Sequence, residues 1–188
     1  MTNRCVMKVG GSLLRRGDFP TRLYQLLETD FSGQQVNLVF GGGKIIDALR
    51  DLDAVHAMKP IDMHWRCVRA LRLTFELACE WFPHANRIES TDSFALHRQC
   101  KTVGHYIIAA DSFYSPRDGA VLPEDWSTTS DSISALLATK LSIDRLVIVK
   151  ACDHHDLTPA EAVNAGIVDP VFPEVSRHLQ IDWKFLGE

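Results

Sequence analysis

The chain has 188 residues, of which 46% are hydrophobic and 23% charged, and its formal net charge is −4 at pH 7. These values are ordinary for a globular protein and disfavour disorder, collagen-like repeats and coiled coils. The sequence pI of about 6.0 disfavours a nucleic-acid scaffold, because proteins that bind the phosphate backbone are usually strongly basic. We expect one domain over residues 1–188 and no nucleic-acid partner.

The five cysteines contain no C-x-x-C pair, and an odd number does not make a disulfide framework. No short-spaced ligand pair predicts a metal site either. The opening segment, MTNRCVMKVGG, reaches lysine and glycine before the apolar core of a signal peptide could form. No apolar run approaches the ~20 residues that cross a bilayer. We therefore expect reduced thiols, a cytoplasmic protein and no membrane partner.

Short apolar runs alternate with helical patterns along the first half of the chain. Residues 5–9 and 36–40 each end at glycines, so both are predicted strands. A helical stripe follows each of them: Leu23, Leu26 and Leu27 after the first, and Ile45, Ile46, Leu49 and Leu52 after the second. This strand–helix–strand–helix order predicts a parallel sheet with right-handed crossovers.

The rest of the chain continues the pattern. Its longest predicted helix covers residues 62–82 and ends near Pro83. The remaining predictions are strands over 105–110, 145–150 and 181–186, helices over 131–141 and 172–179, and a helix that begins at Thr158. The fold class is therefore predicted as α/β, a three-layer αβα sandwich around a mainly parallel sheet.

Two common phosphate-binding motifs are absent. The P-loop pattern fails because Gly43-Lys44 is followed by Ile45, and the dinucleotide pattern G-x-G-x-x-G fails at Ile46. Two other glycine turns, Gly10-Gly11 and Gly41-Gly42-Gly43, each follow a predicted strand. Their N–H groups are suited to binding anions at the carboxyl edge of the sheet. The alternative is that they are only tight turns.

Lysines stand at the ends of two predicted strands. Lys8 lies in an otherwise apolar run and Lys150 closes another. A buried ammonium group requires an anionic partner, either a phosphate or a carboxylate. The alternative is that each lysine extends to solvent from the strand end.

The segment WSTTSDS, residues 126–132, is rich in hydroxyl groups and carries one acid, Asp131, at a helix start. Serine, threonine and aspartate cap helices, and that role alone could explain the segment. The functional interpretation is that Asp131 orients two lysines while the hydroxyl groups of Thr129 and Ser130 bind a phosphorylated substrate. His64 could face the same substrate from the long helix, or it could be a half-buried histidine of the helix start.

Three sets of residues together resemble the amino acid kinase superfamily, which includes the acetylglutamate, aspartate, uridylate and isopentenyl phosphate kinases. They are KVGGSL from Lys8, VFGGG from Val39 and TSDSIS from Thr129. The segment around Trp126 looks closest to the branch that phosphorylates an aminomethylfuran phosphate in the biosynthesis of methanofuran-type C1 carriers.

The resemblance implies a role for each matching residue. Lys8 would contact the transferring phosphoryl group, and Asp131 would orient Lys8 and Lys150. The groups implied to hold ATP phosphates are Lys8, Gly10, Gly11, Ser12 and Lys150. Those expected to hold the acceptor are Gly41, Gly42, Gly43, Thr129, Ser130 and, from its place on the helix, His64. The resemblance also implies ATP with Mg²⁺, and a homodimer or higher homo-oligomer.

After residue 150 the chain departs from the family pattern and is shorter. We therefore expect an acceptor-side part over residues 1–125 and a shortened nucleotide-side part over 126–188. Two functions are carried forward. One is an ATP-dependent kinase that transfers the γ-phosphoryl group to a small anionic metabolite, with a phosphate monoester such as aminomethylfuranyl-methyl phosphate as the expected acceptor. The other is a kinase-like binding protein or partner subunit without transfer activity. The polar run Asp153-His154-His155-Asp156 is read as a loop, with a metal cluster as the alternative.

Overall fold

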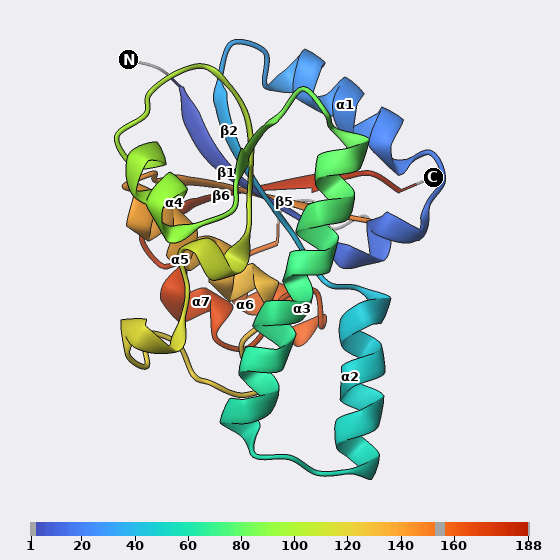
Figure 1. The fold of residues 1–188 in the computed structure, drawn as a ribbon. Helices are drawn as coiled ribbons and strands as arrows, with labels where there is room; N and C mark the ends of the chain where they lie inside the picture. Colours follow the sequence, from blue (N-terminus) through green and yellow to red (C-terminus); the bar gives the residue numbers. More distant parts are fainter. Residues whose placement is uncertain (1–2, 153–156, 188) are drawn as a thin grey trace.

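The computed structural model describes residues 3–152 and 157–187. Six strands form one all-parallel sheet in the order β3-β4-β2-β1-β5-β6 (Figure 1). The strands are β1 (Arg4–Val9), β2 (Gln35–Phe40), β3 (Asn86–Ile88), β4 (Gly104–Ile108), β5 (Arg145–Lys150) and β6 (Gln180–Phe185). The α-helices are α1 (Phe19–Asp30), α2 (Lys44–Val55), α3 (Pro60–Trp81), α4 (Thr91–His97), α5 (Ser130–Leu141), α6 (Pro159–Asn164) and α7 (Phe172–Val175). Short 3₁₀ helices cover Gly11–Arg15 (η1), Ala110–Ser112 (η2) and Pro116–Asp118 (η3).

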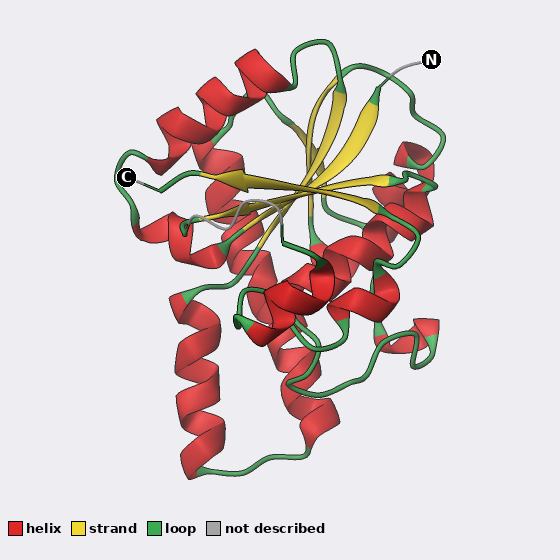
Figure 2. Ribbon diagram, turned by 180° about the vertical axis from the view of Figure 1, so that it is seen from behind, coloured by secondary structure: helices red, strands yellow, loops and turns green. Residues whose placement is uncertain are grey.

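Helices cover both faces of the sheet, which confirms the predicted α/β sandwich (Figure 2). One core joins the sheet to α1 and the second half of α3, with Phe19 and Phe75 fully packed. The other core joins the sheet to α4, α5, α6 and α7, with Leu137 and Phe172 at its centre. Because side chains alternate along a strand, Met7 enters the first core and its neighbour Lys8 faces the layer that contains α5.

The central strands create a crevice at their carboxyl ends. β1 lies between β2 and β5. The chain leaves β1 toward α1 on one face and leaves β5 toward α6 and α7 on the other. In open α/β sheets, ligands bind where neighbouring strands send their connections to opposite faces. Lys8 and Lys150 therefore lie beside a favourable place for a ligand.

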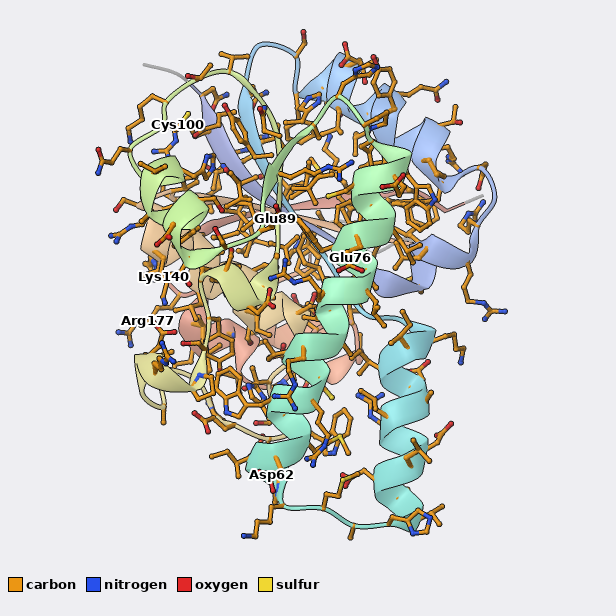
Figure 3. All side chains as sticks on the ribbon, viewed as in Figure 1. Asp62, Glu76, Glu89, Cys100, Lys140 and Arg177 are labelled. Atoms are coloured by element: carbon orange, nitrogen blue, oxygen red, sulfur yellow. The ribbon has the colours of Figure 1, made fainter. Side chains whose placement is uncertain are left out.

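The long helix α3 is only partly a sheet-covering helix. Its second half packs on the sheet, whereas its first half extends past the sheet beside α2 (Figure 1). None of the residues in α2 is fully buried, so its predicted apolar stripe is only partly covered. Glu76, labelled in Figure 3, lies on the exposed side of α3. The α2–α3 pair is thus free to form the wall of a cavity.

The sequence prediction was wrong at several places away from the central strands. The helix predicted over residues 172–179 ends at Val175, because Ser176 begins the turn that leads into β6. The strand predicted over 105–110 ends at Ile108, where the chain enters η2. β3 and α4 were not predicted at all. β3 has only three residues, of which one is buried, so it carries almost no periodic signal.

A buried polar network lies under the sheet at β2. Asn37 is fully buried in this central strand and donates from Nδ2 to the carbonyl of Cys5 at 3.0 Å. Its Oδ1 lies 2.6 Å from His97 Nε2, so we assign the proton of the neutral ring to Nε2. Burial lowers the pKa of His97 to about 4 from 6.5. The ring is therefore held neutral in the folded protein.

This network predicts a loss of stability in mild acid. The folded-state pKa of His97 is depressed, so its contribution is complete above pH 6.5 and is lost as the pH falls toward 4. At about 1.4 kcal/mol per pKa unit, the loss is roughly 3 kcal/mol. Replacement His97→Gln keeps a donor for Asn37 and removes this titration. We expect urea unfolding of His97→Gln to depend less on pH between 7 and 4 than that of the wild type. The exposed His84→Gln serves as the control, and equal pH dependence in all three proteins would contradict the assignment.

Candidate functional site

A carboxylate lies between two lysines at the carboxyl ends of β1 and β5. Lys8 Nζ lies 2.8 Å from Asp131 Oδ1, and their side chains are only 4% and 6% exposed. Lys150 Nζ lies 3.0 Å from Oδ1 and 3.2 Å from Oδ2 of the same carboxylate. Neither lysine follows the alternative of extending to solvent. We call Lys8, Asp131 and Lys150 the charged triad.

The triad carries one more positive than negative charge in a buried setting. Burial lowers the pKa of Lys8 to about 8, and the neighbouring Lys150 pushes it in the same direction while Asp131 opposes it. Burial acts to raise the pKa of Asp131, but Lys8 and Lys150 outweigh it and hold that pKa below its usual value. An uncompensated positive charge in a buried site attracts anionic ligands.

Two glycine loops meet directly beside the triad. A Cβ built on Gly11 would lie 2.1 Å from the backbone nitrogen of Gly43, and one on Gly43 would lie 2.3 Å from the carbonyl oxygen of Gly11. Gly43 also has a φ of +50°, which other residues rarely adopt. The two loops therefore pack backbone against backbone. This close approach requires glycine at both positions, which a tight turn alone would not.

The amide groups of these loops divide into two sets. The N–H of Gly10 donates to the carbonyl of Val149 at 2.8 Å, and that of Gly41 donates to Val9 at 2.9 Å. In residues 3–152 and 157–187, the N–H groups of Gly42 and Gly43 donate to no backbone carbonyl. The N–H of Gly11 likewise donates to no backbone carbonyl of the described residues. Gly11, Gly42 and Gly43 therefore offer amides that an anion can use.

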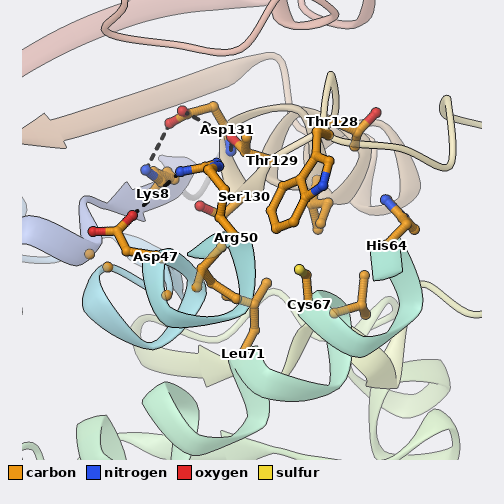
Figure 4. Close-up of a pocket in the computed structure, with 18 of the residues that line it drawn as sticks. Lys8, Asp47, Arg50, His64, Cys67, Leu71, Thr128, Thr129, Ser130 and Asp131 are labelled. Atoms are coloured by element: carbon orange, nitrogen blue, oxygen red, sulfur yellow. Dashed lines mark hydrogen bonds and ion pairs between the residues drawn. The ribbon is translucent and has the colours of Figure 1, made fainter. Parts of the chain in front are cut away.

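A cavity of about 190 Å³ opens from the triad toward α2 and α3 (Figure 4). Its lining brings together many of the predicted residues: Lys8, Gly11, Gly41, Gly42, Gly43, His64, Thr129, Ser130 and Asp131. Gly10, Ser12 and Lys150 are outside this lining. A Cβ on Gly10 would lie 3.5 Å from Lys150 Cδ, so Gly10 lies next to this member of the triad. Ser12 is exposed on η1.

The far end of the cavity has a cation and an aromatic ring that the sequence analysis did not assign. The guanidinium of Arg50 lies 4.7 Å from the centre of the Trp126 ring. Trp126 Nε1 donates to Asp53 at 2.7 Å, which fixes the indole against α2. Arg50 was missed because nothing in the sequence of its helix indicates that it contacts Trp126, which is 76 residues later in the chain.

Three predicted acceptor residues line the cavity in different ways. His64 is buried, with Nε2 at 3.0 Å from Tyr114 Oη and Nδ1 at 3.4 Å from the carbonyl of Asp125. Burial lowers its pKa. The hydroxyl of Thr129 donates to Asp169 at 2.8 Å, so its first role is structural. Ser130 Oγ would lie 2.9 Å from a Cβ on Gly41, which places its hydroxyl at the glycine loop.

Asp169 is a second buried carboxylate beside α5, and the sequence analysis missed it. It is 6% exposed and bonds to both Thr129 and Ser132. An Asp-Pro pair shortly before a helix start is a capping signal that could have drawn attention to it.

Three further predictions concern other parts of the chain. The run Asp153–Asp156 lies outside the described residues. Within them, no group of three or more histidine, cysteine, aspartate or glutamate side chains could hold a metal ion. All five cysteines are free thiols. No helix in the described part of the chain has the length and hydropathy that a bilayer crossing requires.

Several solved structures on which the chain superposes are kinases. The chain superposes on a UMP kinase from Ureaplasma parvum with a TM-score of 0.67 and 14% identity, covering 99% of this chain and 91% of the other. For a UMP kinase from Bacillus anthracis the values are 0.69, 14%, 97% and 87%. For an aspartate kinase from Synechocystis they are 0.61, 16%, 95% and 38%. The sequence itself matches no protein-family model and no curated protein. At these identities the likeness shows a shared kinase-like fold.

The contact between the glycine loops predicts a position-specific intolerance of side chains. Gly11→Ala would place a methyl group against the backbone of Gly43 and force the loops apart, so we expect a loss of roughly 1–3 kcal/mol. Gly17→Ala is the matched control, since nothing lies within 4 Å of a Cβ there, and we expect a change within about 0.5 kcal/mol. Urea midpoints measure both, and equal midpoints would contradict the described packing.

Proposed function

We propose that this protein is an ATP-dependent kinase that transfers the γ-phosphoryl group to a small anionic acceptor. The observation that carries the proposal is the charged triad at the crevice between β1 and β5, beside the free amides of Gly42 and Gly43. Phosphoryl transfer depends mainly on positioning and on stabilising the charge of the equatorial oxygens. Two lysines fixed by one carboxylate supply both.

The residues around the triad would hold a nucleoside triphosphate on one side and an acceptor on the other. Lys150 and the N–H of Gly11 would hold the donor phosphates, and Gly42 and Gly43 the acceptor. Lys8 lies between the two sides, where it neutralises charge on the phosphoryl group in transit. ATP would supply that group. Mg²⁺ would accompany ATP and neutralise part of the phosphate charge. Both oxygens of Asp131 already contact lysines, so we assign no protein ligand to Mg²⁺.

The cavity favours a small acceptor. Its volume of about 190 Å³ is below the ~300–1,000 Å³ of sites for larger ligands. Arg50 supplies a cation and Trp126 a flat apolar face, which suit a monocyclic ring that carries an anionic group. A phosphate monoester acceptor is already ionised at pH 7 and requires no general base. Aminomethylfuranyl-methyl phosphate belongs to this class, and UMP, named for the superposed kinases, is the larger member to compare.

Calorimetric titration with Mg-ATP, alone and with a panel of phosphate monoesters, tests the proposal first. We expect micromolar binding of Mg-ATP and diphosphate formation with at least one monocyclic ester. Binding of an ester without any transfer would instead support the kinase-like binding protein or partner subunit. We also propose that the protein forms a homodimer or higher homo-oligomer, and analytical ultracentrifugation of the same sample tests this.

Charge removal at the triad should abolish turnover without unfolding the chain. Lys8→Met keeps the apolar stem of the side chain and removes the ammonium group, and Asp131→Asn releases both lysines. We expect kcat to fall at least 10²-fold in each variant, the magnitude typical for losing one group that stabilises transition-state charge.

Lys184→Met is the matched control for these variants. It removes a strand lysine whose ion pair with Asp30, at 2.7 Å, lies on the surface. We expect it to retain wild-type kcat. Full activity of Lys8→Met with a productive acceptor would refute the role given to Lys8.

A further inference from the structure

The segment that follows α6 reaches back to the charged triad through one carboxylate. Asp169 Oδ2 accepts hydrogen bonds from the N–H of Thr129 at 2.9 Å, from its hydroxyl at 2.8 Å and from the N–H of Ser132 at 3.1 Å. Asp169 Oδ1 accepts from the hydroxyl of Ser132 and from the N–H groups of Val171 and Phe172 at 3.2 and 3.0 Å. Six donors thus converge on one buried side chain.

Four of these six donors flank the carboxylate of the triad. Thr129 and Ser132 stand on either side of Asp131 at the start of α5. The Thr129 hydroxyl also lies 3.3 Å from Asp131 Oδ2 and accepts from the N–H of Asp131. The same segment contacts the triad a second time, because Lys150 Nζ donates to the carbonyl of Ile167 at 2.6 Å. The segment therefore fixes both the carboxylate and one lysine.

We propose that Asp169 is a positioning residue that holds Asp131 between Lys8 and Lys150. The proposal rests on the proposed function for its kinetic consequence, but not for its effect on the lysines. Asp169 bonds to the residues on either side of Asp131, and it is not among the residues that line the cavity. It therefore acts through the first turn of α5, and Thr129 is the cavity-lining residue that it contacts.

A positioning role and a purely structural role differ in what they do to Lys8. Its charged form is opposed by burial and by Lys150, and supported by Asp131. If the first turn of α5 moves when Asp169 is changed, Lys8 loses part of that support and its pKa falls. A residue that only caps α5 and α7 would lower the melting temperature and leave the titration of Lys8 unchanged.

The test follows lysine titration by NMR in protein carrying ¹³C-labelled lysine, with Lys8 assigned from its absence in Lys8→Arg. We expect the Lys8 midpoint of Asp169→Asn to lie about one pH unit or more below the wild-type value of about 8. Ser90→Ala is the control, since it removes the cap of α4 remote from the triad. An unchanged midpoint in folded Asp169→Asn would overturn the proposal.

A second variant covers the case in which Asp169→Asn does not fold. Ser132→Ala removes one of the six donors, and a smaller shift in the same direction supports the proposal, whereas an unchanged midpoint refutes it. In active protein we also expect Asp169→Asn to lower kcat at least tenfold with the acceptor KM within about twofold. If no acceptor is ever phosphorylated, the proposed function fails while the NMR titration still decides the role of Asp169.

Discussion

The carboxylate of Asp131, buried between two ammonium groups, is the interaction around which the site is organised. Its partners come from β1 and β5 and it stands on α5, so three separate elements must assemble before any charge is compensated. Removing one member leaves a buried charge without its partner, which costs more than losing a surface pair. The strands that carry the two lysines, β1 and β5, are otherwise almost wholly apolar. Their close packing at the centre of the sheet fixes the positions of the two lysine side chains.

The site combines a fixed part with a variable part. Strand ends set the position of the two lysines, and the glycine loops set the position of the free amides. The opposite wall is built from α2 and the first half of α3, which extend past the sheet, and α2 has no fully buried residue. Arg50, Trp126 and Asp53 meet on this wall. Under the proposed function, transfer chemistry is therefore concentrated at the sheet edge, and recognition of the acceptor at the helical wall.

The central strands were predictable because each is a short apolar run ended by glycines or lysine, and these same end residues pointed to the site. The helix α2 was predicted from its apolar stripe. The small extent to which that stripe is buried could not be predicted, because it depends on what packs against the helix. Asp169 illustrates the remaining limit. Its donors at the start of α5 lie 37 and 40 residues away in sequence, so no local pattern connects it to Asp131. Short elements such as β3 were missed for a different reason, because three residues give no periodicity.

The contact between Gly11 and Gly43 has a consequence for how this architecture can diversify. Two backbones in van der Waals contact have no side chain between them to enlarge or shorten. Under the proposed function, the span between donor and acceptor phosphates is then set by main-chain geometry alone. Substitution of the residues that line the helical wall can alter which molecule fills the cavity without changing the path that the phosphoryl group travels. A change of substrate in this scaffold must therefore arise at α2, α3 and the Trp126 segment, while the transfer distance stays constant.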